Sequence, residues 1–436
     1  MLRDHRTVTT VVSSDLCMSC GICQPSCHVD AITIINDKKK GMFIPVIDES
    51  ICDFCEEATV GKCVIVCPGV EVNFTRLADK FIEGEHHSQV LGHYNKCYYA
   101  HANDEDVRFT SSSGGLVTSL LIFALEQKLI EGVAVITMTS GLEPRGVIAR
   151  TAEEVKAAAG SKYCPAHLGD ALTEISNSEG RYAVVGLPCH LHGVRKLEKI
   201  NPQLKNKILY HFGLYCANTN SFHGTEYFLR ENEINPADVE QLRYRGMGWP
   251  GMFSVTLKDG QMKTIRRGTT ESDKKRRAKF SSAFHYDFQL PRCFTCNDLT
   301  AELADISFAD PWNKKFKGKE KIGKSMLVVR NKIGDELLKL AAKMDAITLE
   351  EADAREVENS QNVDFKKGAQ SRLNVLHFLG KATPHYIGKT QPVNIRYKWN
   401  LIFHIMSFIP KNRFTLKFLP LVQLSRRIML KLGNLL

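Results

Sequence analysis

The stretch Cys17-Met-Ser-Cys20-Gly-Ile-Cys23-Gln-Pro-Ser-Cys27 decides the fold of the N-terminal part of the chain. Its cysteines follow the spacing C-x2-C-x2-C-x3-C, and such short gaps bend the backbone around one corner of a cube of iron and sulfide. Gly21 supplies the backbone freedom that this wrapping requires. A second group has a middle gap of seven residues instead of two, and it consists of Cys52, Cys55, Cys63 and Cys67, followed by Pro68.

Two groups of this kind are typical of two-cluster ferredoxins, in which the fourth cysteine of each group ligates the cluster of the other group. A pair of zinc sites is the competing interpretation, because cysteines spaced in this way bind either metal. Four cysteines within eleven residues fit zinc poorly, and this favours iron–sulfur. We therefore predict one [4Fe–4S] centre at Cys17, Cys20, Cys23 and Cys67, and a second at Cys27, Cys52, Cys55 and Cys63.

The composition is that of an ordinary globular protein. The chain has 436 residues, of which 43% are hydrophobic and 24% charged, and this excludes a disordered or collagen-like chain. No apolar segment of the signal-peptide type follows the charged N-terminus, so we expect a cytoplasmic protein whose clustered cysteines bind metal. The run from Trp399 to Ile409 is about half as long as the ~20 residues of a membrane-spanning helix.

The net charge of +10 is concentrated at the C-terminal end. Residues 365–436 hold 13 lysines and arginines and no aspartate or glutamate. We expect residues 351–436 to form a basic C-terminal extension, in which 402–436 resembles short amphipathic pieces. Several interpretations stay open: the extension contacts the inner face of a membrane peripherally, docks onto a partner protein, packs on the core, or is a solvated basic face.

Six further cysteines lie outside the N-terminal groups, and Cys97 and Cys164 are two of them. Cys189 and Cys216 each follow a strand-like apolar run, and α/β proteins place ligands at such strand ends. Cys293 and Cys296 form a C-x2-C pair, which by itself supplies only two metal ligands. A buried small apolar side chain is the alternative for any one cysteine. The spacing leaves open whether a third cluster forms at Cys189, Cys216, Cys293 and Cys296.

Strand-like and helix-like segments alternate through the middle of the chain, which favours α/β layering. Residues 79–103 are polar, and we expect them to link the N-terminal unit to this region. The predicted domains are residues 1–80, 81–350 and 351–436. The expected strands are 133–138, 183–187 and 208–215, the expected helices are 116–130, 190–200 and 222–231, and a hairpin is expected at 253–266.

The loop at residues 111–115 is rich in serine and glycine and precedes an expected helix. Such loops offer backbone N–H groups and a helix N-terminus to phosphate, but serine is also an ordinary N-cap residue, and the residues alone favour neither interpretation. The basic run 273–279 has no aromatic residues interleaved with it. We therefore expect a solvated loop there and no nucleic-acid partner.

Seven short motifs follow one another over about residues 85–345. They are Arg108-Phe-Thr-Ser-Ser-Ser-Gly-Gly115 with Thr118, Gly160-Ser-Lys-Tyr163, Val185-Gly-Leu-Pro-Cys-His190, Gly213-Leu-Tyr-Cys216, Tyr244-Arg-Gly-Met-Gly-Trp-Pro-Gly251, Cys293-x2-Cys296-x-Asp298 and Ala304-Asp-Ile-Ser-Phe-Ala-Asp310 with Trp312. With these motifs the chain resembles the coenzyme F420 hydrogenase/dehydrogenase beta-subunit family, whose coenzyme is a deazaflavin.

The resemblance implies FAD bound to an α/β core with an iron–sulfur cluster nearby. The expected fold class is therefore α+β: an N-terminal ferredoxin-like dicluster domain followed by an α/β flavin-binding domain. The resemblance also favours the third [4Fe–4S] cluster at Cys189, Cys216, Cys293 and Cys296. It assigns flavin contacts to Arg108, Ser111, Ser113, Gly114, Gly115, Thr118, Ser161, Lys162, Tyr163 and Pro188.

A flavin exchanges two electrons with hydride carriers and single electrons with clusters, so it is the converter that this set of cofactors needs. We expect an oxidoreductase that passes electrons between coenzyme F420, or a similar hydride carrier, and ferredoxin-type clusters through FAD. A redox partner protein or a ferredoxin is the expected external partner, and no catalytic side chain is predicted. Two alternatives stay open: a reductase of cell-surface polysaccharide biosynthesis that does not use coenzyme F420, and a non-catalytic electron-relay subunit.

Overall fold

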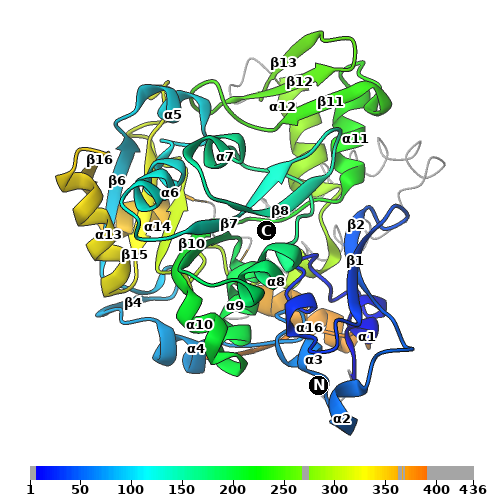
Figure 1. Cartoon of the computed structure of the whole chain (residues 1–436). Coiled ribbons are helices and arrows are strands. Elements are labelled where there is room, and N and C mark those ends of the chain that lie inside the picture. The colour runs from blue at the N-terminus through cyan, green and yellow to red at the C-terminus, as the bar shows by residue number, and fades with distance from the viewer. Residues whose placement is uncertain (1–5, 268–273, 362–365, 367–368, 390–436) are drawn as a thin grey trace.

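A mixed eight-stranded sheet forms the centre of the computed structural model, which describes residues 6–267, 274–361, 366 and 369–389 (Figure 1). The strand order is β16-β6-β15-β14-β10-β9-β7-β8. The four strands from β14 to β7 run parallel to one another, and the outer pairs are antiparallel. The strands are β6 (Lys96–Ala102), β7 (Gly132–Met138), β8 (Pro144–Ala149), β9 (Tyr182–Gly186), β10 (Ile208–Leu214), β14 (Ile306–Ala309), β15 (Ser325–Val329) and β16 (Ile347–Glu351).

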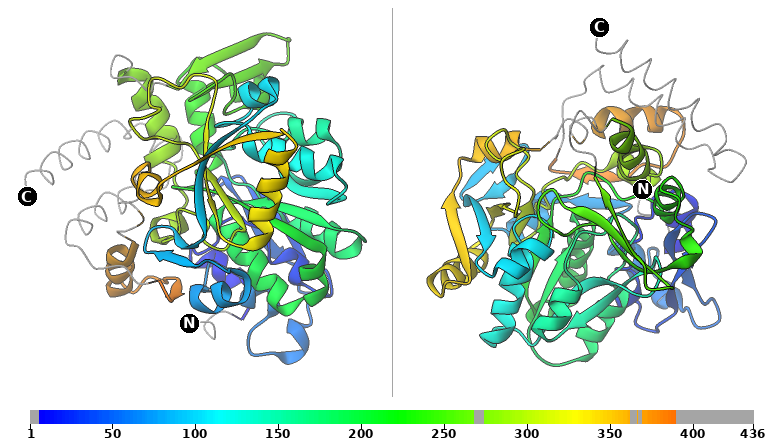
Figure 2. Two further views of the ribbon diagram at one scale, coloured as in Figure 1. Left: turned by 90° about the vertical axis from the view of Figure 1, so that its left-hand side faces the viewer. Right: turned by 90° about the horizontal axis from the view of Figure 1, so that it is seen from above.

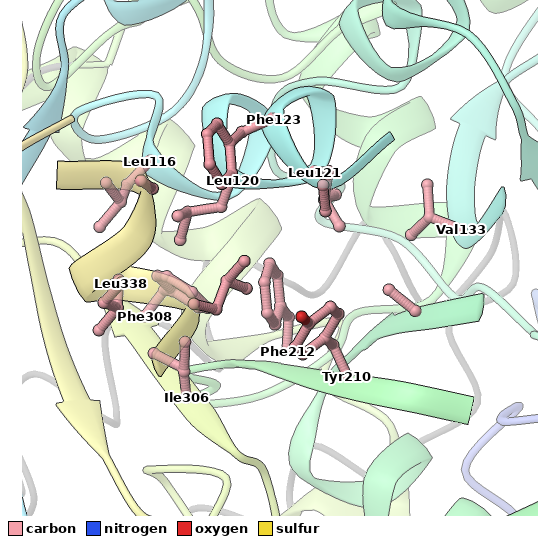
Figure 3. Close-up of a cluster of buried hydrophobic side chains, with 14 of the residues drawn as sticks. Leu116, Leu120, Leu121, Phe123, Val133, Tyr210, Phe212, Ile306, Phe308 and Leu338 are labelled. Carbon is pink, nitrogen blue, oxygen red and sulfur yellow. The ribbon is translucent and has the colours of Figure 1, made fainter. Parts of the chain in front are cut away.

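Helices cover both faces of this sheet (Figures 1 and 2). Successive residues of a strand point to opposite faces, so Val133 packs on the first helix layer while Ala134 packs on the second. Phe212 and Phe308 continue the first layer, which Figure 3 shows. The first layer contains α6 (Leu116–Glu126) and α13 (Lys332–Lys343), and the second contains α8 (Gly169–Asn177), α9 (Pro188–Ile200) and α10 (Pro202–Lys207).

The N-terminal unit, blue in Figure 1, packs beside α8 and α9. Ile22 is fully buried against these helices. Gly21 has φ +75°, and a Cβ at this position would lie 2.8 Å from His167 Cβ and 2.9 Å from Gly169 N. Glycine is therefore required here both by the backbone conformation and by close contact with the core. The elements of the unit include α1 (Val8–Ser13), β1 (Ile32–Asp37), β2 (Met42–Ile47), α3 (Lys62–Ile65) and β3 (Glu71–Asn73).

A three-stranded antiparallel sheet extends from the main body, green in Figure 1. Two of its strands form the hairpin that the sequence predicts. The sheet packs on the helix α11 (Phe222–Arg230) through aromatic side chains, of which Phe228 and Phe253 have ring centroids 4.9 Å apart. Its strands are β11 (Val239–Arg243), β12 (Met252–Leu257) and β13 (Met262–Arg266).

The elements predicted for the middle of the chain are confirmed with small shifts in their bounds. The strands predicted at 133–138, 183–187 and 208–215 are β7, β9 and β10, and the helices predicted at 190–200 and 222–231 are α9 and α11. The helix predicted for 116–130 ends earlier, at Glu126, because the chain turns at Lys128, whose φ is +54°.

The polar linker predicted for residues 79–103 is wrong. Part of it is β6, which lies between β16 and β15 within the main sheet. Cys97 and Tyr99 are buried on one face of this strand, and Ala100 is buried on the other. Lys96 and His101 flank these residues, and the polar composition of the segment before them concealed the strand.

The first part of the predicted C-terminal extension folds back onto the protein. Its elements are α14 (Ala354–Asn359), α16 (Ala369–Phe378) and β17 (His385–Ile387), and β17 pairs in parallel with β3 of the N-terminal unit. The amphipathic segment 402–436, with its expected membrane contact, lies outside the described residues. Among the helices that are described, none has the length and apolar character needed to cross a membrane.

A buried ionic network joins α9, β10 and the start of β14. Asp305 accepts hydrogen bonds from Arg195 Nη2 (2.6 Å) and from the backbone N–H of His211 (2.7 Å). Glu198 lies 2.6 Å from His211 Nε2 and 3.2 Å from Arg195 Nη1. Burial opposes ionisation of Asp305, but Arg195 and His211 more than offset it, so the pKa of this carboxyl lies well below its ordinary value.

The substitution Asp305→Asn removes this buried negative charge and leaves Arg195 short of a partner. We expect it to lower the free energy of unfolding by about 3 kcal/mol at neutral pH, where the aspartate is ionised. Thermal unfolding of the purified variant and wild type measures the difference. Glu336→Gln is the control, because Glu336 is exposed and pairs with Lys332 on its own helix, and its effect should stay below about 0.5 kcal/mol. Equal melting of the two variants would contradict the expectation.

Candidate functional site

Four thiols of the N-terminal unit surround one small space. The space measures about 20 Å³, and apolar side chains of α1 and β2, such as Val11 and Phe43, close it from other sides. Three of the cysteines come from the loop after α1, and the fourth follows α3. The structure therefore brings together the first predicted ligand set, Cys17, Cys20, Cys23 and Cys67.

Burial raises the pKa of the thiols in this first group. The pKa of Cys17 is raised to about 12, and the neighbouring Cys67 contributes to this rise. Lys196 acts in the opposite direction on Cys67. Its Nζ donates hydrogen bonds to the backbone oxygens of Cys67 (2.8 Å) and Glu71 (2.7 Å). Thiols whose pKa is raised in this way stay protonated at neutral pH. They become ligands only when a metal centre binds and displaces the protons.

The second group lies on the short helices α2 (Phe54–Glu57) and α3 and in the loops beside them. Burial raises the pKa of Cys63 to about 11, and the thiols of Cys55 and Cys27 add to this effect. The backbone N–H groups of Ala31 and Lys62 donate to the sulfurs of Cys27 and Cys55, each at 3.3 Å. Three of the four predicted ligands, Cys27, Cys55 and Cys63, therefore lie close together. Cys52, the fourth, is partly buried and lies two residues before α2, the helix that contains Cys55.

The third group lies at the carboxyl ends of two parallel strands. Cys189 follows β9 in the first turn of α9, and Cys216 follows β10. Cys293 and Cys296 come from the short helix η6 (Pro291–Thr295) and its C-cap. Burial raises the pKa of Cys189 well above its ordinary value, and the other three thiols raise it further. The fold therefore brings together four cysteines whose positions in the sequence are far apart.

The separation of the sulfur atoms bears on the choice between zinc and a multi-iron centre. Four sulfurs around one zinc, each about 2.3 Å from the metal, lie roughly 3.8 Å apart. Among the described residues, no three of these sulfurs all lie within 4.8 Å of one another. The group that does meet this limit contains His28, Asp53 and Cys55, of which only one is a predicted ligand. The wider thiol groups disfavour single zinc ions.

The first thiol group adjoins each of the other two. The thiol of Cys67 in the first group raises the pKa of Cys63 in the second. The thiol of Cys20 in the first group raises the pKa of Cys189 in the third, and among thiols it is the strongest influence on Cys189. The first group therefore lies between the other two.

A hydrogen-bonded bridge also connects the first and third groups. Arg292 directly precedes Cys293, and its guanidinium reaches the backbone that directly follows Cys67. Arg292 Nε donates to Gly69 O (3.0 Å), and Nη2 donates to Pro68 O (3.2 Å). Arg292 is 2% exposed, so these bonds lie in the interior.

A cavity of about 250 Å³ lies at the carboxyl ends of β7, β9, β10 and β14. Parallel sheets bind ligands at this edge. Part of the wall is apolar and includes Leu116, Val185 and Phe308, whereas the serine loop and Lys162 form a polar part. His190 and Tyr215, which are neighbours of Cys189 and Cys216 in the chain, also line it. Such a combination fits an aromatic ring system that carries phosphate groups.

The N-terminus of α6 faces this cavity. Gly115 precedes the helix with φ +70°, and no side chain caps the helix. The N–H of Ser119 is the first to bond back, to Gly115 O at 2.9 Å, so the N–H groups of residues 116–118 have no partner within the helix. These three residues line the cavity. The arrangement favours the phosphate-binding interpretation of the loop over an ordinary N-cap.

Two basic residues bring positive charge to the cavity. Burial lowers the pKa of Lys162 to about 7, with a further contribution from Arg243, and its Nζ donates to Ala158 O. Arg245 donates to Asp310 from Nη1 (2.6 Å) and Nη2 (3.0 Å). Arg245 Nε is buried without a hydrogen-bond partner in the described part of the chain. Burial of such a donor without a partner is costly, and Asp310 balances the charge of the guanidinium.

Six of the ten predicted flavin contacts line this cavity, namely Ser111, Ser113, Gly115, Thr118, Ser161 and Lys162. The loop is fixed by its own hydrogen bonds, from Ser111 Oγ to Thr118 Oγ1 (3.3 Å) and between Ser112 and Ser161 (3.0 Å). Asp310 accepts a hydrogen bond from Ser113 Oγ (2.6 Å). These contacts hold the loop open toward the cavity.

The other four predicted contacts lie away from the lining. Arg108 Nε donates to Gly323 O at 2.7 Å. Gly114 packs against backbone, since a Cβ there would lie 2.8 Å from Ser325 N. Tyr163 belongs to an aromatic cluster with Tyr244 and Phe284. Pro188 is buried in the first turn of α9. Their role is to support the walls.

Several cavity residues were not predicted as site residues, notably His190, Asp310 and Gln361. His190 Nδ1 accepts from Leu187 N–H (3.2 Å), and burial lowers the pKa of His190 to about 4. Asp310 also accepts from Trp249 Nε1 (2.8 Å), and Arg245 outweighs the effect of burial to lower the pKa of Asp310 to about 2. A charged residue directly after an apolar strand was the available signal for Asp310.

A second cavity of about 560 Å³ lies between the main sheet and the small antiparallel sheet. It shares the residues 159–162 and Arg245 with the first cavity, so Lys162 borders both. Met138, Arg243 and Thr256 form other parts of its wall. Two ligands bound in these spaces would have the segment 160–162 between them.

The sequence matches three protein-family descriptions. The first is a 4Fe-4S dicluster domain, matched by residues 16–72. The other two are the N-terminal and C-terminal parts of the coenzyme F420 hydrogenase/dehydrogenase beta subunit, matched by residues 97–173 and 179–355. The two parts of the beta subunit together cover more than half of the chain.

Individual proteins give the same picture. A subunit of the F(420)H(2) dehydrogenase of Methanosarcina mazei is 27% identical over 324 residues, which is 71% of this chain and 81% of that protein. The coenzyme F420-dependent sulfite reductase of Methanocaldococcus jannaschii is 25% identical over 78% of this chain, and the match spans 48% of that longer protein. A chain of the F420-reducing [NiFe] hydrogenase complex from Methanosarcina barkeri has a TM-score of 0.51 at 21% identity, covering 67% of this chain and 96% of that one, which supports the fold.

The substitution Cys189→Ala tests the third thiol group. We expect the variant, purified without oxygen, to contain about four fewer iron atoms per chain than wild type, because a four-iron cluster loses a ligand. Chemical iron analysis measures the difference. Cys97→Ala is the control, since Cys97 is buried on β6 and the groups that influence its thiol are an arginine and carboxylates. Wild-type iron content in Cys189→Ala would contradict the assignment.

Proposed function

The chain belongs to the coenzyme F420 hydrogenase/dehydrogenase beta-subunit family, and we propose that it is an iron–sulfur flavoprotein that exchanges electrons between coenzyme F420 and a redox partner protein. Membership makes it an oxidoreductase with a 4Fe-4S dicluster domain. The observation that carries the finer proposal is the row of three thiol groups that begins beside the cavity at the carboxyl edge of the sheet.

The residues present fit the proposed cofactors. The cavity would hold FAD, with the free N–H groups at the start of α6 and Lys162 available to its phosphates. When bound, a flavin converts between the two electrons of a hydride and the single electrons that iron–sulfur clusters carry. The proposed ligand sets are Cys17, Cys20, Cys23 and Cys67; Cys27, Cys52, Cys55 and Cys63; and Cys189, Cys216, Cys293 and Cys296.

The order of the thiol groups supports a direction through the molecule. The third group lies beside the cavity, the first group follows, and the second group lies outermost. Three of the four cysteines of the second group, Cys27, Cys52 and Cys55, are partly exposed, compared with two of the four in the first group, Cys17 and Cys67. We therefore propose that the redox partner docks at the loops of the second group.

Lys162 is the side chain best placed to respond to a bound anion. It borders both cavities, and burial lowers its pKa to about 7, so it changes charge near neutral pH. Its ammonium form would stabilise negative charge on a ligand in either cavity. The partial burial of Lys162 in the cavity wall strengthens this interaction.

The direct test of the function adds reduced coenzyme F420 to the protein, as purified without oxygen. We expect the absorption of bound flavin to bleach, followed by the appearance of reduced iron–sulfur signals in electron paramagnetic resonance. Cys189→Ala should keep the bleaching and lose most of the later signal, because the third thiol group lies next to the cavity. A flavin that dithionite bleaches but reduced coenzyme F420 does not would contradict the use of this coenzyme and favour another hydride donor.

The binding of FAD to flavin-depleted protein should take up a proton in a pH-dependent manner. Free Lys162 is mostly neutral at pH 8, and an anionic ligand raises its pKa, so close to one proton is taken up at pH 8 and little at pH 6. Calorimetry in buffers of different ionisation enthalpy measures this number. We expect Lys162→Met to abolish the uptake and Lys156→Met, an exposed residue of α7 (Ala152–Ala157), to preserve it. Uptake by Lys162→Met at the wild-type level would exclude this lysine.

A further inference from the structure

The C-terminal end of the described chain contacts the cavity, the third thiol group and the backbone that follows the first thiol group. We call Gln361, Lys366 and residues 369–389 the C-terminal strap. It lies beyond residue 355, where the match to the beta-subunit family ends. Its helix α16 packs against η6, which lies far from it in the sequence.

The strap begins at the cavity. Gln361 lines the cavity, and its Nε2 donates to the backbone oxygen of Asp310 at 2.6 Å. Asp310 in turn holds Arg245 and the serine loop. The first residue of the strap is thus bonded to the residue that organises the polar wall.

Lys366 brings a buried cation to the third thiol group. The residue is 3% exposed, and its side chain bonds to the thiol of Cys296. Burial lowers the pKa of Lys366, but the thiols of Cys296, Cys216 and Cys293 more than offset this and leave it raised. In return, Lys366 is the strongest influence after burial on Cys216 and on Cys293. One cation therefore faces three of the four thiols.

The helix α16 packs directly on the segment that carries two of these thiols. Arg372 is fully buried, and its Nε donates to the backbone oxygen of Phe294, between Cys293 and Cys296. Asn297 Nδ2 donates to the backbone oxygen of Lys389 at 3.3 Å. These bonds fix the C-x2-C segment from both sides.

The far end of the strap reaches the first thiol group. β17 pairs with β3, which begins four residues after Cys67, and His385 N–H donates to Val70 O at 2.7 Å. The ring of Tyr386 lies 5.4 Å from the guanidinium of Arg292, the residue that bridges the first and third groups. The strap thus ends against the bridge.

We propose that the C-terminal strap is a positioning element for the third thiol group, and that Lys366 is the buried cation that raises the reduction potential of the iron–sulfur cluster held there. This inference rests on the proposed function. Reduction adds one negative charge to a cluster, and a nearby cation stabilises the reduced form more than the oxidised form. Removal of the cation therefore makes the cluster harder to reduce.

The test replaces Lys366 with Gln and, as a second variant that keeps the length and apolar stem, with Met. Redox titration followed by electron paramagnetic resonance measures the potential of each cluster. We expect the reduction potential of the third cluster to become more negative, because the variants lose the hydrogen bond from the charged Lys366 to Cys296. At a fixed ambient potential, about tenfold less of this cluster should be reduced. The two clusters of the N-terminal unit should keep their potentials.

Two controls make the result specific. Lys366→Arg keeps the charge and should keep most of the wild-type potential, and Lys381→Gln removes an exposed charge from the same strap and should change nothing. An unchanged potential of the third cluster in both Lys366→Gln and Lys366→Met, at wild-type iron content, would overturn the role of Lys366 and leave the proposed function standing. Wild-type protein with iron for only two clusters, or without flavin, would instead overturn the proposed function itself.

Discussion

Buried sulfur ligands concentrate negative charge in the interior, and the chain must supply cations to balance it. Lys196 does so at Cys67 from α9, Arg292 from η6 between the first and third groups, and Lys366 from the C-terminal strap. Each cation comes from a different part of the sequence. Removal of one partner from a buried charge pair is far more costly than the pair itself is stabilising. This constraint ties the N-terminal unit, the sheet and the C-terminal end into one structure.

The topology of the sheet explains why the third thiol group and the cavity adjoin. Cys189, Cys216 and Asp310 all follow parallel strands, and the carboxyl ends of parallel strands meet at one edge. The first turn of α9 carries Cys189 into the thiol group and His190 into the cavity wall, so adjacent residues serve the two sites. A shift of this helix would disturb both sites together.

The parts of the site that sequence reasoning could predict are those fixed by local spacing. The ligand set with Cys67 was predicted from the spacing of two cysteine groups together with the crossed ligation of two-cluster ferredoxins, and the structure brings its thiols together. The third group depends on strand order, which spacing does not encode, and only the family resemblance favoured it. The strand β6 and the burial of Lys366 were not predicted, because polar residues in β6 and the basic composition of the C-terminal end both indicated surface. In each case long-range packing decided the outcome, and Lys366 is buried beside thiols that lie far away in the sequence.

The N-terminal unit and the C-terminal strap extend the chain on either side of the residues matched to the beta subunit, and they meet each other through β3 and β17. A unit joined to a core by a linker alone is expected to move relative to that core. Here Ile22 inserts between α8 and α9, Gly21 approaches Gly169 backbone to backbone, and Arg292 bonds across to Pro68. With the strap as a fourth attachment, the first thiol group is held beside the third in one arrangement. The proposed relay of single electrons between neighbouring sites needs such a fixed separation, and contacts from both extensions contribute to it.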